Sequence, residues 1–236
     1  MDRSSEIAAN LEKVERDIAT ALAAVGRARS EITLIAVTKN FPVSDIEILY
    51  QLGVRDFGEN RDQEARAKVA DFKRAGIRWH FQGQLQRNKL PSIGSWADLV
   101  HSVDDVKYLK GLSDAAGKAD RHLQCLIQIS LDDEQSTGRA GTDLSGAREI
   151  ISTFERNQES LSGISVTGLM GVAPLGSPAK PAFARLYEVY TTLRAEYPPI
   201  NILSAGMSGD FVEALLTGAT HLRIGSSILG SRVTTG

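Results

Sequence analysis

ITLIAVTK, residues 32–39, is a short run of β-branched and other apolar residues that ends in a lysine. Runs of this kind, apolar on both faces, are typical of strands in a parallel sheet covered by helices. Seven more strand-like runs lie along the chain, and a helical pattern follows each of them except the last. They are VRDFGE (54–59), RWHFQG (78–83), DLVHSV (98–103), HLQCLIQIS (122–130), ISVTGLMGV (164–172), INILSAG (200–206) and HLRIGSSIL (221–229).

Regular alternation of strands and helices implies parallel pairing through right-handed crossovers. Eight such units can close into a barrel, and 236 residues is near the usual barrel size of about 250. We therefore predict an α/β protein that forms a single (β/α)8 TIM barrel domain over residues 1–236, with an open doubly wound sheet as the alternative. An extra N-terminal helix is predicted by one apolar stripe, formed by Ile7, Leu11, Val14, Ile18 and Leu22.

The composition is ordinary for a soluble globular protein, with 42% hydrophobic and 24% charged residues. The formal net charge of -2 gives no broad field that would favour nucleic acid or an anionic membrane. The sequence shows neither a membrane-spanning run nor a secretory signal. The single cysteine, Cys125, excludes an intramolecular disulfide and suits a reducing compartment. We expect a cytoplasmic protein with no nucleic-acid or membrane partner.

Lys39 closes the first predicted strand, at the end of a barrel where ligands bind. Lysine is rarely buried without a partner. A partly desolvated amine has a lowered pKa and can form a Schiff base with a carbonyl compound. The alternative is an ordinary lysine just beyond the rim, whose amine reaches water. Taken alone, the residue favours this second interpretation.

The loops after the seventh and eighth predicted strands have the composition of a phosphate site. They read SAGMSGD (204–210) and RIGSS (223–227), and barrels usually bind phosphate at these two loops. Glycines let the backbone approach a phosphate closely, and N–H groups at a helix N-terminus favour its charge. Ser208 also suits a helix N-cap, and Gly-Ser pairs are common in turns.

Two further residues at strand ends are candidates for the same site. Arg223 lies two residues before Gly225, so both should share the face that points into the barrel mouth. A buried arginine requires an anionic or acceptor partner, either a ligand or a barrel carboxylate. Asn60 follows the second strand and could cap the next helix or contact a ligand. We expect no metal site, because no metal-ligand spacing occurs in the sequence.

Several segments together resemble the pyridoxal phosphate homeostasis protein family, in that family's order, from about residue 32 to 230. The segments are AVTK (36–39), FGENR (57–61), WHFQGQLQRNK (79–89), HSVD (101–104), GLMGVAP (168–174), SAGMSGDF (204–211) and HLRIGSSILG (221–230). The resemblance implies a fold-type III barrel that binds pyridoxal 5′-phosphate (PLP), like the N-terminal domain of alanine racemase.

The resemblance also implies roles for individual residues. Lys39 would form the Schiff base, and Asn60 would line the ring pocket. Arg223 would face the pyridine nitrogen and keep it unprotonated, which makes the ring a weaker electron sink. The phosphate would be held by Ser208, Gly225 and Ser226, with Ser204 and Met207 nearby. We assign no catalytic residue.

The chain departs from the family pattern at two places. Gln84 stands where a histidine is frequent. The polar stretch 132–142 contains QSTGR (135–139), which lacks the lysine that many members have after the serine. A role of that lysine in binding or releasing a second PLP is therefore not carried over, and Arg139 is the residue that could replace it. The stretch could equally be a solvated loop or a lid over the site.

Two functions from different classes fit these features. One is PLP homeostasis by storage, buffering or delivery, and the other is a PLP-dependent amino-acid racemase or related enzyme. Racemisation needs a second acid or base opposite the lysine, which fold-type III racemases take from an additional β-domain and a partner subunit. The chain ends at Gly236, six residues after ILG (228–230), so we expect homeostasis without turnover, and a monomer.

Delivery of the cofactor would make apo forms of PLP-dependent enzymes the partners of this protein. A third alternative is a Schiff-base aldolase for a phosphosugar. It would use the same lysine and phosphate loops without PLP.

Overall fold

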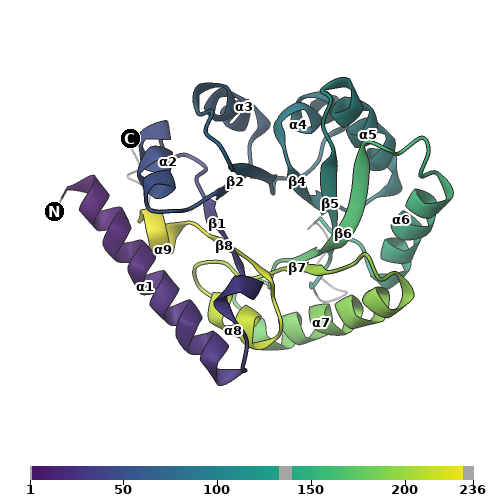
Figure 1. Ribbon diagram of the computed structural model, residues 1–236. Helices are drawn as coiled ribbons and strands as arrows, with labels where there is room; N and C mark the ends of the chain where they lie inside the picture. Colours follow the sequence, from purple (N-terminus) through teal and green to yellow (C-terminus); the bar gives the residue numbers. More distant parts are fainter. Residues whose placement is uncertain (1, 133–139, 231–236) are drawn as a thin grey trace.

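Eight parallel strands close into a barrel in the computed structural model, which describes residues 2–132 and 140–230. The strands follow one another around the barrel in chain order, and β8 pairs with β1 to complete it. Figure 1 shows the strands in the centre with the helices around them. The predicted (β/α)8 barrel is confirmed, and the open-sheet alternative is wrong.

All eight predicted strand regions contain a strand. The strands are β1 (Thr33–Val37), β2 (Asp56–Glu59), β3 (Arg78–Phe81), β4 (Leu99–Val103), β5 (Leu123–Ile129), β6 (Ile164–Gly171), β7 (Ile202–Ser204) and β8 (His221–Ile224). The α-helices that follow them are α2 (Val43–Gln51), α3 (Asp62–Asp71), α4 (Leu90–Trp96), α5 (Leu109–Lys118), α6 (Leu144–Arg156), α7 (Ala179–Glu196), α8 (Phe211–Leu216) and α9 (Ser226–Leu229).

The structure of residues 221–229 differs from the prediction of one continuous strand. Its first four residues form β8, but residues 226–229 form the helix α9. The backbone turns at Gly225, whose carbonyl accepts hydrogen bonds from the N–H groups of Ile228 and Leu229, at 3.0 and 2.9 Å. A short apolar run such as SSIL does not distinguish a strand from a helical turn by periodicity.

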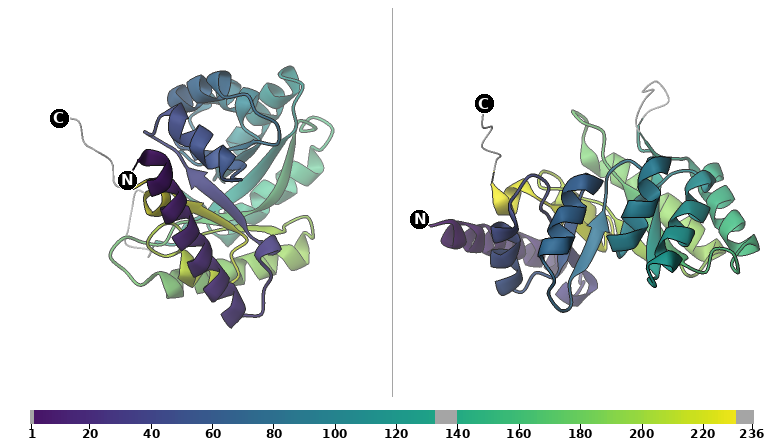
Figure 2. Two further views of the ribbon diagram at one scale, coloured as in Figure 1. Left: turned by 60° about the vertical axis from the view of Figure 1, so that its left-hand side comes forward. Right: turned by 90° about the horizontal axis from the view of Figure 1, so that it is seen from above.

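The N-terminal helix α1 (Arg3–Ala24) confirms the predicted extra helix, and all five residues of its apolar stripe are buried. Its contacts are with α8, α9 and α2. Near its start, the Asn10 amide donates to the carbonyl of Ile228 at 3.0 Å, and Arg3 Nη2 donates to that of Leu229 at 3.0 Å. Figure 2 shows α1 lying along the outside of the barrel beside α9.

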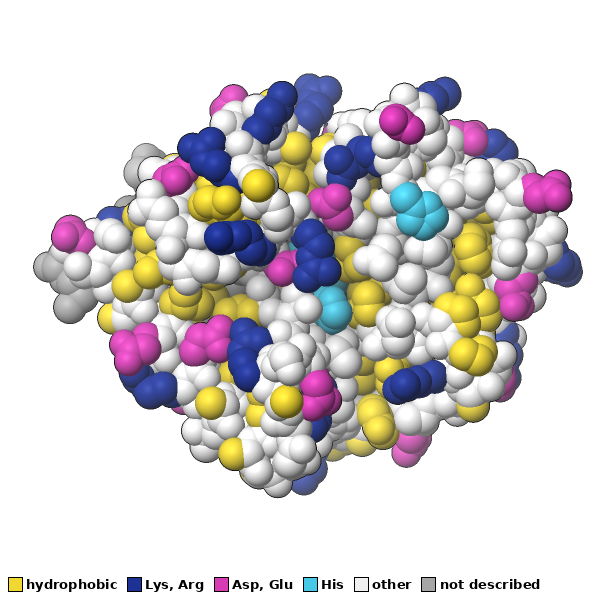
Figure 3. Space-filling view, viewed as in Figure 1, with side chains coloured by type: hydrophobic (Ala, Val, Ile, Leu, Met, Phe, Trp, Pro, Cys, Tyr) yellow, Lys and Arg dark blue, Asp and Glu magenta, His cyan; other side chains and the backbone are white. Residues whose placement is uncertain are grey.

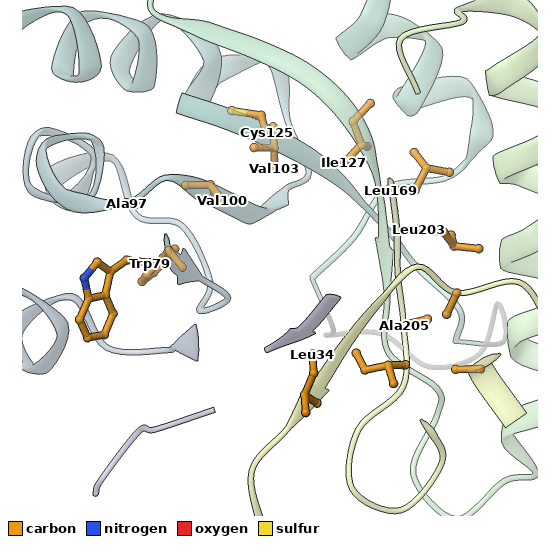
Figure 4. Close-up of a cluster of buried hydrophobic side chains, with 14 of the residues drawn as sticks. Leu34, Trp79, Ala97, Val100, Val103, Cys125, Ile127, Leu169, Leu203 and Ala205 are labelled. Carbon is orange, nitrogen blue, oxygen red and sulfur yellow. The ribbon is translucent and has the colours of Figure 1, made fainter. Parts of the chain in front are cut away.

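The two faces of the strands have different surroundings. One set of alternating residues packs into a large apolar cluster; Figure 4 shows Val100, Cys125, Ile127 and Leu203 among its members. The other set includes a small apolar group of Leu99, Leu126, Met170 and Ile202. The same inward faces also carry buried polar groups, among them Asp56, His80, His101, Ser204 and Arg223. The barrel interior is thus only partly apolar.

Three observations concern the surface and the core of the described residues. On the face shown in Figure 3, basic and acidic side chains are interspersed. None of the helices in the described part of the chain is long and apolar enough to cross a membrane. Burial raises the pKa of Cys125 to about 12, so its thiol stays protonated inside the core.

Packing of α1 on the barrel can be tested at Ile18, which is fully buried. We expect Ile18→Ala to lower the free energy of unfolding by about 2–5 kcal/mol, because it removes apolar contacts and leaves a cavity. Urea denaturation followed by circular dichroism measures this change. The control Asp17→Ala alters an exposed neighbour and should stay within about 0.5 kcal/mol of the parent protein. Equal losses in both variants would contradict the packing role.

Candidate functional site

A cavity of about 560 Å³ opens at the rim where the carboxyl ends of the strands meet. Its walls come from β1, β6 and β8 and from the residues that follow β1, β2, β3, β6, β7 and β8. The lining residues are Val37, Lys39, Phe41, Asn60, Gln82, Met170, Val172, Met207, Ser208, Gly209, Arg223, Gly225, Ser226 and Gly230. This is the end of the barrel at which ligands of this fold bind.

Lys39 lies two residues beyond β1, in a turn, and is half-buried at the cavity wall. The turn is held on both sides of the lysine. Before it, the Thr38 N–H donates to the carbonyl of Gly58 at 2.9 Å, and the Thr38 carbonyl accepts from Phe41 N–H at 3.0 Å. After it, Asn40 has a φ of 63°, a left-handed conformation that asparagine tolerates better than most residues. These contacts fix the backbone conformation of the turn from which the Lys39 side chain extends.

A second lysine, Lys68 on α3, binds the backbone of this turn. Its Nζ donates to the Thr38 carbonyl at 2.7 Å, to Glu59 Oε1 at 2.7 Å and to Glu64 Oε1 at 2.6 Å. Burial raises the pKa of Glu59 despite the lysine beside it. Sequence analysis missed Lys68, because a lysine in the polar helical segment 62–71 carries no sign of burial.

The loops after β7 and β8 are tied to each other by Ser208. Its Oγ accepts from the Ser227 N–H at 3.1 Å, and Ser227 Oγ donates to the Ser208 carbonyl at 3.3 Å. Asp210, not Ser208, precedes α8 as its N-cap. Gly206 turns the chain out of β7 with a φ of +88°, and a Cβ there would lie 2.9 Å from Phe211 Cα. A glycine is therefore required at this turn.

Arg223 reaches the cavity from inside the barrel and is only 4% exposed. Its Nη1 donates to Ser204 Oγ at 2.6 Å and its Nη2 to the Gly171 carbonyl at 2.9 Å. Burial lowers the pKa of Arg223 to about 10, so the guanidinium is still protonated at neutral pH. Ser204 is fully buried beneath the cavity and is not one of its lining residues.

Two amides at the rim have polar atoms without a described partner. They are Asn60 Oδ1 and Gln82 Nε2, both buried. Asn60 does not cap α3, which begins at Asp62 with Arg61 as N-cap. Gln82 was missed in the sequence, although it directly follows β3 at the same rim. Its amide lies against Gly58, where a Cβ would come within 2.4 Å of Nε2.

The structure thus brings seven of the eight predicted site residues to one cavity, and Ser204 lies just below it. Gln84 lines a neighbouring cavity of about 670 Å³ that shares Asn60 with the first. Arg139 and the rest of 133–139 lie outside the described residues. A primary amine, two amides, a guanidinium and loops rich in serine and glycine suit a ligand that has both a carbonyl carbon and an anionic group.

Comparisons with known proteins show the family to which the chain belongs. Residues 7–233 match the family described as alanine racemase, N-terminal domain. The pyridoxal phosphate homeostasis protein of Mycobacterium bovis is 37% identical, over 98% of this chain and 95% of that protein. The protein of the same name from Escherichia coli K12 is 34% identical, over 97% of each.

Solved structures give the same picture. PipY of Synechococcus elongatus PCC7942 matches 90% of this chain with all of its own, with a TM-score of 0.79 at 33% identity without PLP and 0.73 at 32% identity with PLP bound. Alanine racemase of Clostridium difficile 630 shares the fold, with a TM-score of 0.74 at 13% identity over 98% of this chain and 58% of its own. The chain therefore belongs to the alanine racemase N-terminal domain family and, within it, to the pyridoxal phosphate homeostasis proteins.

Proposed function

We propose that this protein binds PLP as a Schiff base on Lys39 and serves PLP homeostasis by storing, buffering or delivering the cofactor, without turning over a substrate of its own. One observation carries this proposal: Lys39 and the serine- and glycine-rich loops after β7 and β8 line the same cavity. An amine and a phosphate-type cradle in one cavity match the aldehyde and the phosphate of PLP. The relatives named as homeostasis proteins, and PipY with PLP bound, support it further.

The residues present fit PLP in another respect. Buried polar groups normally have a hydrogen-bond partner in the protein, a ligand or a water. Asn60 Oδ1 and Gln82 Nε2 lack one among the described residues, and both line the cavity. We assign the ring pocket to these two amides, and the phosphate to the loops that carry Ser208 and Ser226. When bound, PLP supplies the carbonyl carbon and an electron-withdrawing ring.

Arg223 is assigned to the pyridine nitrogen. A guanidinium that stays protonated can only donate a hydrogen bond, so the nitrogen facing it remains unprotonated and the ring withdraws electrons less strongly. Such a ring suits a carrier, because weak withdrawal disfavours loss of an α-proton from an attached amino acid. Ser204 acts through Arg223, since its hydroxyl holds the guanidinium at 2.6 Å.

Turnover of an amino-acid substrate would need a further ionisable group at the cavity. A racemase requires a second acid or base opposite the lysine, whereas the described lining residues include two ionisable side chains, Lys39 and Arg223. For a carrier we further propose a monomer in the cytoplasm, with apo forms of PLP-dependent enzymes as recipients. The single buried cysteine is in keeping with a reducing compartment.

Formation of the Schiff base is tested by absorbance. We expect the protein to take up PLP with a visible absorbance band that borohydride removes, because reduction converts the imine to an amine. Peptide mapping should then find the label on Lys39 and not on Lys68. Lys39→Ala should lack the band, and Lys89→Ala, at the neighbouring cavity, should keep it. Absence of the protein-bound absorbance band after incubation with excess PLP would contradict the proposal.

The assignment of Arg223 is tested by its removal. We expect Arg223→Ala to shift the absorbance band and to weaken PLP binding by about ten- to a hundredfold, because a charge-assisted hydrogen bond is lost. Equilibrium titration with PLP measures both effects. Arg87→Ala removes an exposed arginine as a control and should match the parent protein. Unchanged affinity and spectrum in Arg223→Ala would contradict its place against the ring.

The absence of turnover is tested by exchange of the α-proton. In deuterated water, a panel of amino acids incubated with the PLP-loaded protein should show no saturable exchange by proton NMR beyond that caused by free PLP. Lys39→Ala with the same total PLP provides the background. Robust, saturable exchange that Lys39→Ala abolishes would instead establish a racemase-like enzyme.

A further inference from the structure

A line of hydrogen-bonded side chains runs through the interior of the barrel and ends at Arg223. It joins five strands in the order β2, β3, β4, β7 and β8, and we call it the interior relay. Its links are Asp56 Oδ1 to His80 Nε2 (2.9 Å), His80 Nδ1 to His101 Nε2 (3.0 Å), His101 Nδ1 to Ser204 Oγ (2.9 Å) and Ser204 Oγ to Arg223 Nη1 (2.6 Å).

One arrangement of protons satisfies every link. Burial lowers the pKa of His101 well below its usual value, so this ring is neutral and carries one proton. Arg223 can only donate to Ser204 Oγ. If the Ser204 hydroxyl in turn donates to His101 Nδ1, then His101 Nε2–H donates to His80 Nδ1. His80 Nε2–H then donates to the carboxylate of Asp56, and all donors point the same way.

The opposite arrangement is less satisfactory. It places two protons on His80, so that His101 Nδ1–H would donate to Ser204 Oγ. That oxygen already accepts from Arg223, and its own proton would then have no acceptor among the described hydrogen bonds. It would also put a second positive charge on the path between Arg223 and Asp56. The positive ring would then share Asp56 Oδ1 with Arg78, whose Nε already lies 2.8 Å from that oxygen.

The relay connects the Arg223 guanidinium to a negative charge that its direct hydrogen-bond acceptors do not provide. The direct acceptors of Arg223 are the neutral Ser204 hydroxyl and the Gly171 carbonyl. A carboxylate lies at the other end of the relay: hydrogen bonds from His80 and Arg78 lower the pKa of Asp56 against the opposing effect of burial. Hydrogen bonds in such a chain polarise one another, most of all in a low-dielectric interior. Negative charge at Asp56 is thus felt at Arg223 through oriented neutral groups.

We propose that Asp56, His80 and His101 are positioning residues of the cofactor site: the interior relay orients the Ser204 hydroxyl and thereby holds the charged Arg223 guanidinium in the cavity. None of the three lines the cavity. The inference rests on the proposed function in so far as PLP is the ligand that Arg223 meets. The proton arrangement itself belongs to the protein without PLP.

The first experiment examines the relay without cofactor. In the full chain labelled with 15N-histidine and freed of PLP, long-range proton–nitrogen NMR at neutral pH should show His80 and His101 as neutral rings with the proton on Nε2. Assignment uses His80→Gln and His101→Gln. A doubly protonated His80, or a proton on Nδ1 of His101, would overturn the relay, whatever the outcome for PLP.

The second experiment examines its effect on the site. His101→Phe keeps a ring but removes both nitrogens, and it should weaken PLP binding by about tenfold and shift the absorbance band. His122→Phe is the control: His122 is exposed and hydrogen-bonds the Ser162 carbonyl outside the relay, so this variant should stay within about twofold of the parent. Indistinguishable affinities and spectra in the two variants would overturn the positioning role.

Asp56→Asn complements these variants where His101→Phe disturbs folding. The amide oxygen can still accept from His80, so the variant removes the charge and keeps the hydrogen bond. A smaller shift of the band in the same direction as in His101→Phe is expected, and no shift would overturn the contribution of the charge. If the parent protein itself does not bind PLP, the proposed function fails, while the NMR result still decides on the relay.

Discussion

Every strand of this barrel has one face against helices and the other in an interior shielded from solvent. Closure of the sheet makes this unavoidable, because alternate residues of all eight strands then point inward. A polar or charged group on the inner face must find its partners there. The site depends on this constraint, since Arg223 lies on an inner face and carries a charge. Its surroundings are arranged accordingly.

Two buried polar networks hold residues of the cavity wall in place. One is the cluster of Lys68 with Glu59 and Glu64, which binds the carbonyl of the residue before Lys39. The other is the interior relay, which begins at Asp56 and reaches Arg223 through the Ser204 hydroxyl. Breaking a buried ionic or hydrogen-bonded network is costly because polar groups are left unsatisfied. The backbone before Lys39 and the Arg223 guanidinium are therefore held by contacts within the protein itself.

This arrangement favours retention of a cofactor over its use. The proposed Schiff base on Lys39 would be a covalent but reversible attachment, and the loops rich in serine and glycine would add contacts for an anionic group. In the proposed complex a protonated guanidinium would face the ring nitrogen and limit electron withdrawal by the ring. The rim amides of Asn60 and Gln82 add orientation without offering a proton of suitable acidity. Binding and release then require no chemistry beyond exchange of the imine.

The sequence by itself determined the barrel, the extra helix and the end of the barrel that carries the site, because these follow from local periodicity and from what directly follows each strand. It did not separate the residues that line the cavity from Ser204, which lies beneath it. It also showed neither the burial of Lys68 nor the relay. His101 and Ser204 are 103 positions apart in the chain, and their contact exists only because β4 and β7 face each other across a closed barrel. Partners across that interior were decided by the tertiary structure, since strand closure, not sequence spacing, sets which inward side chains meet.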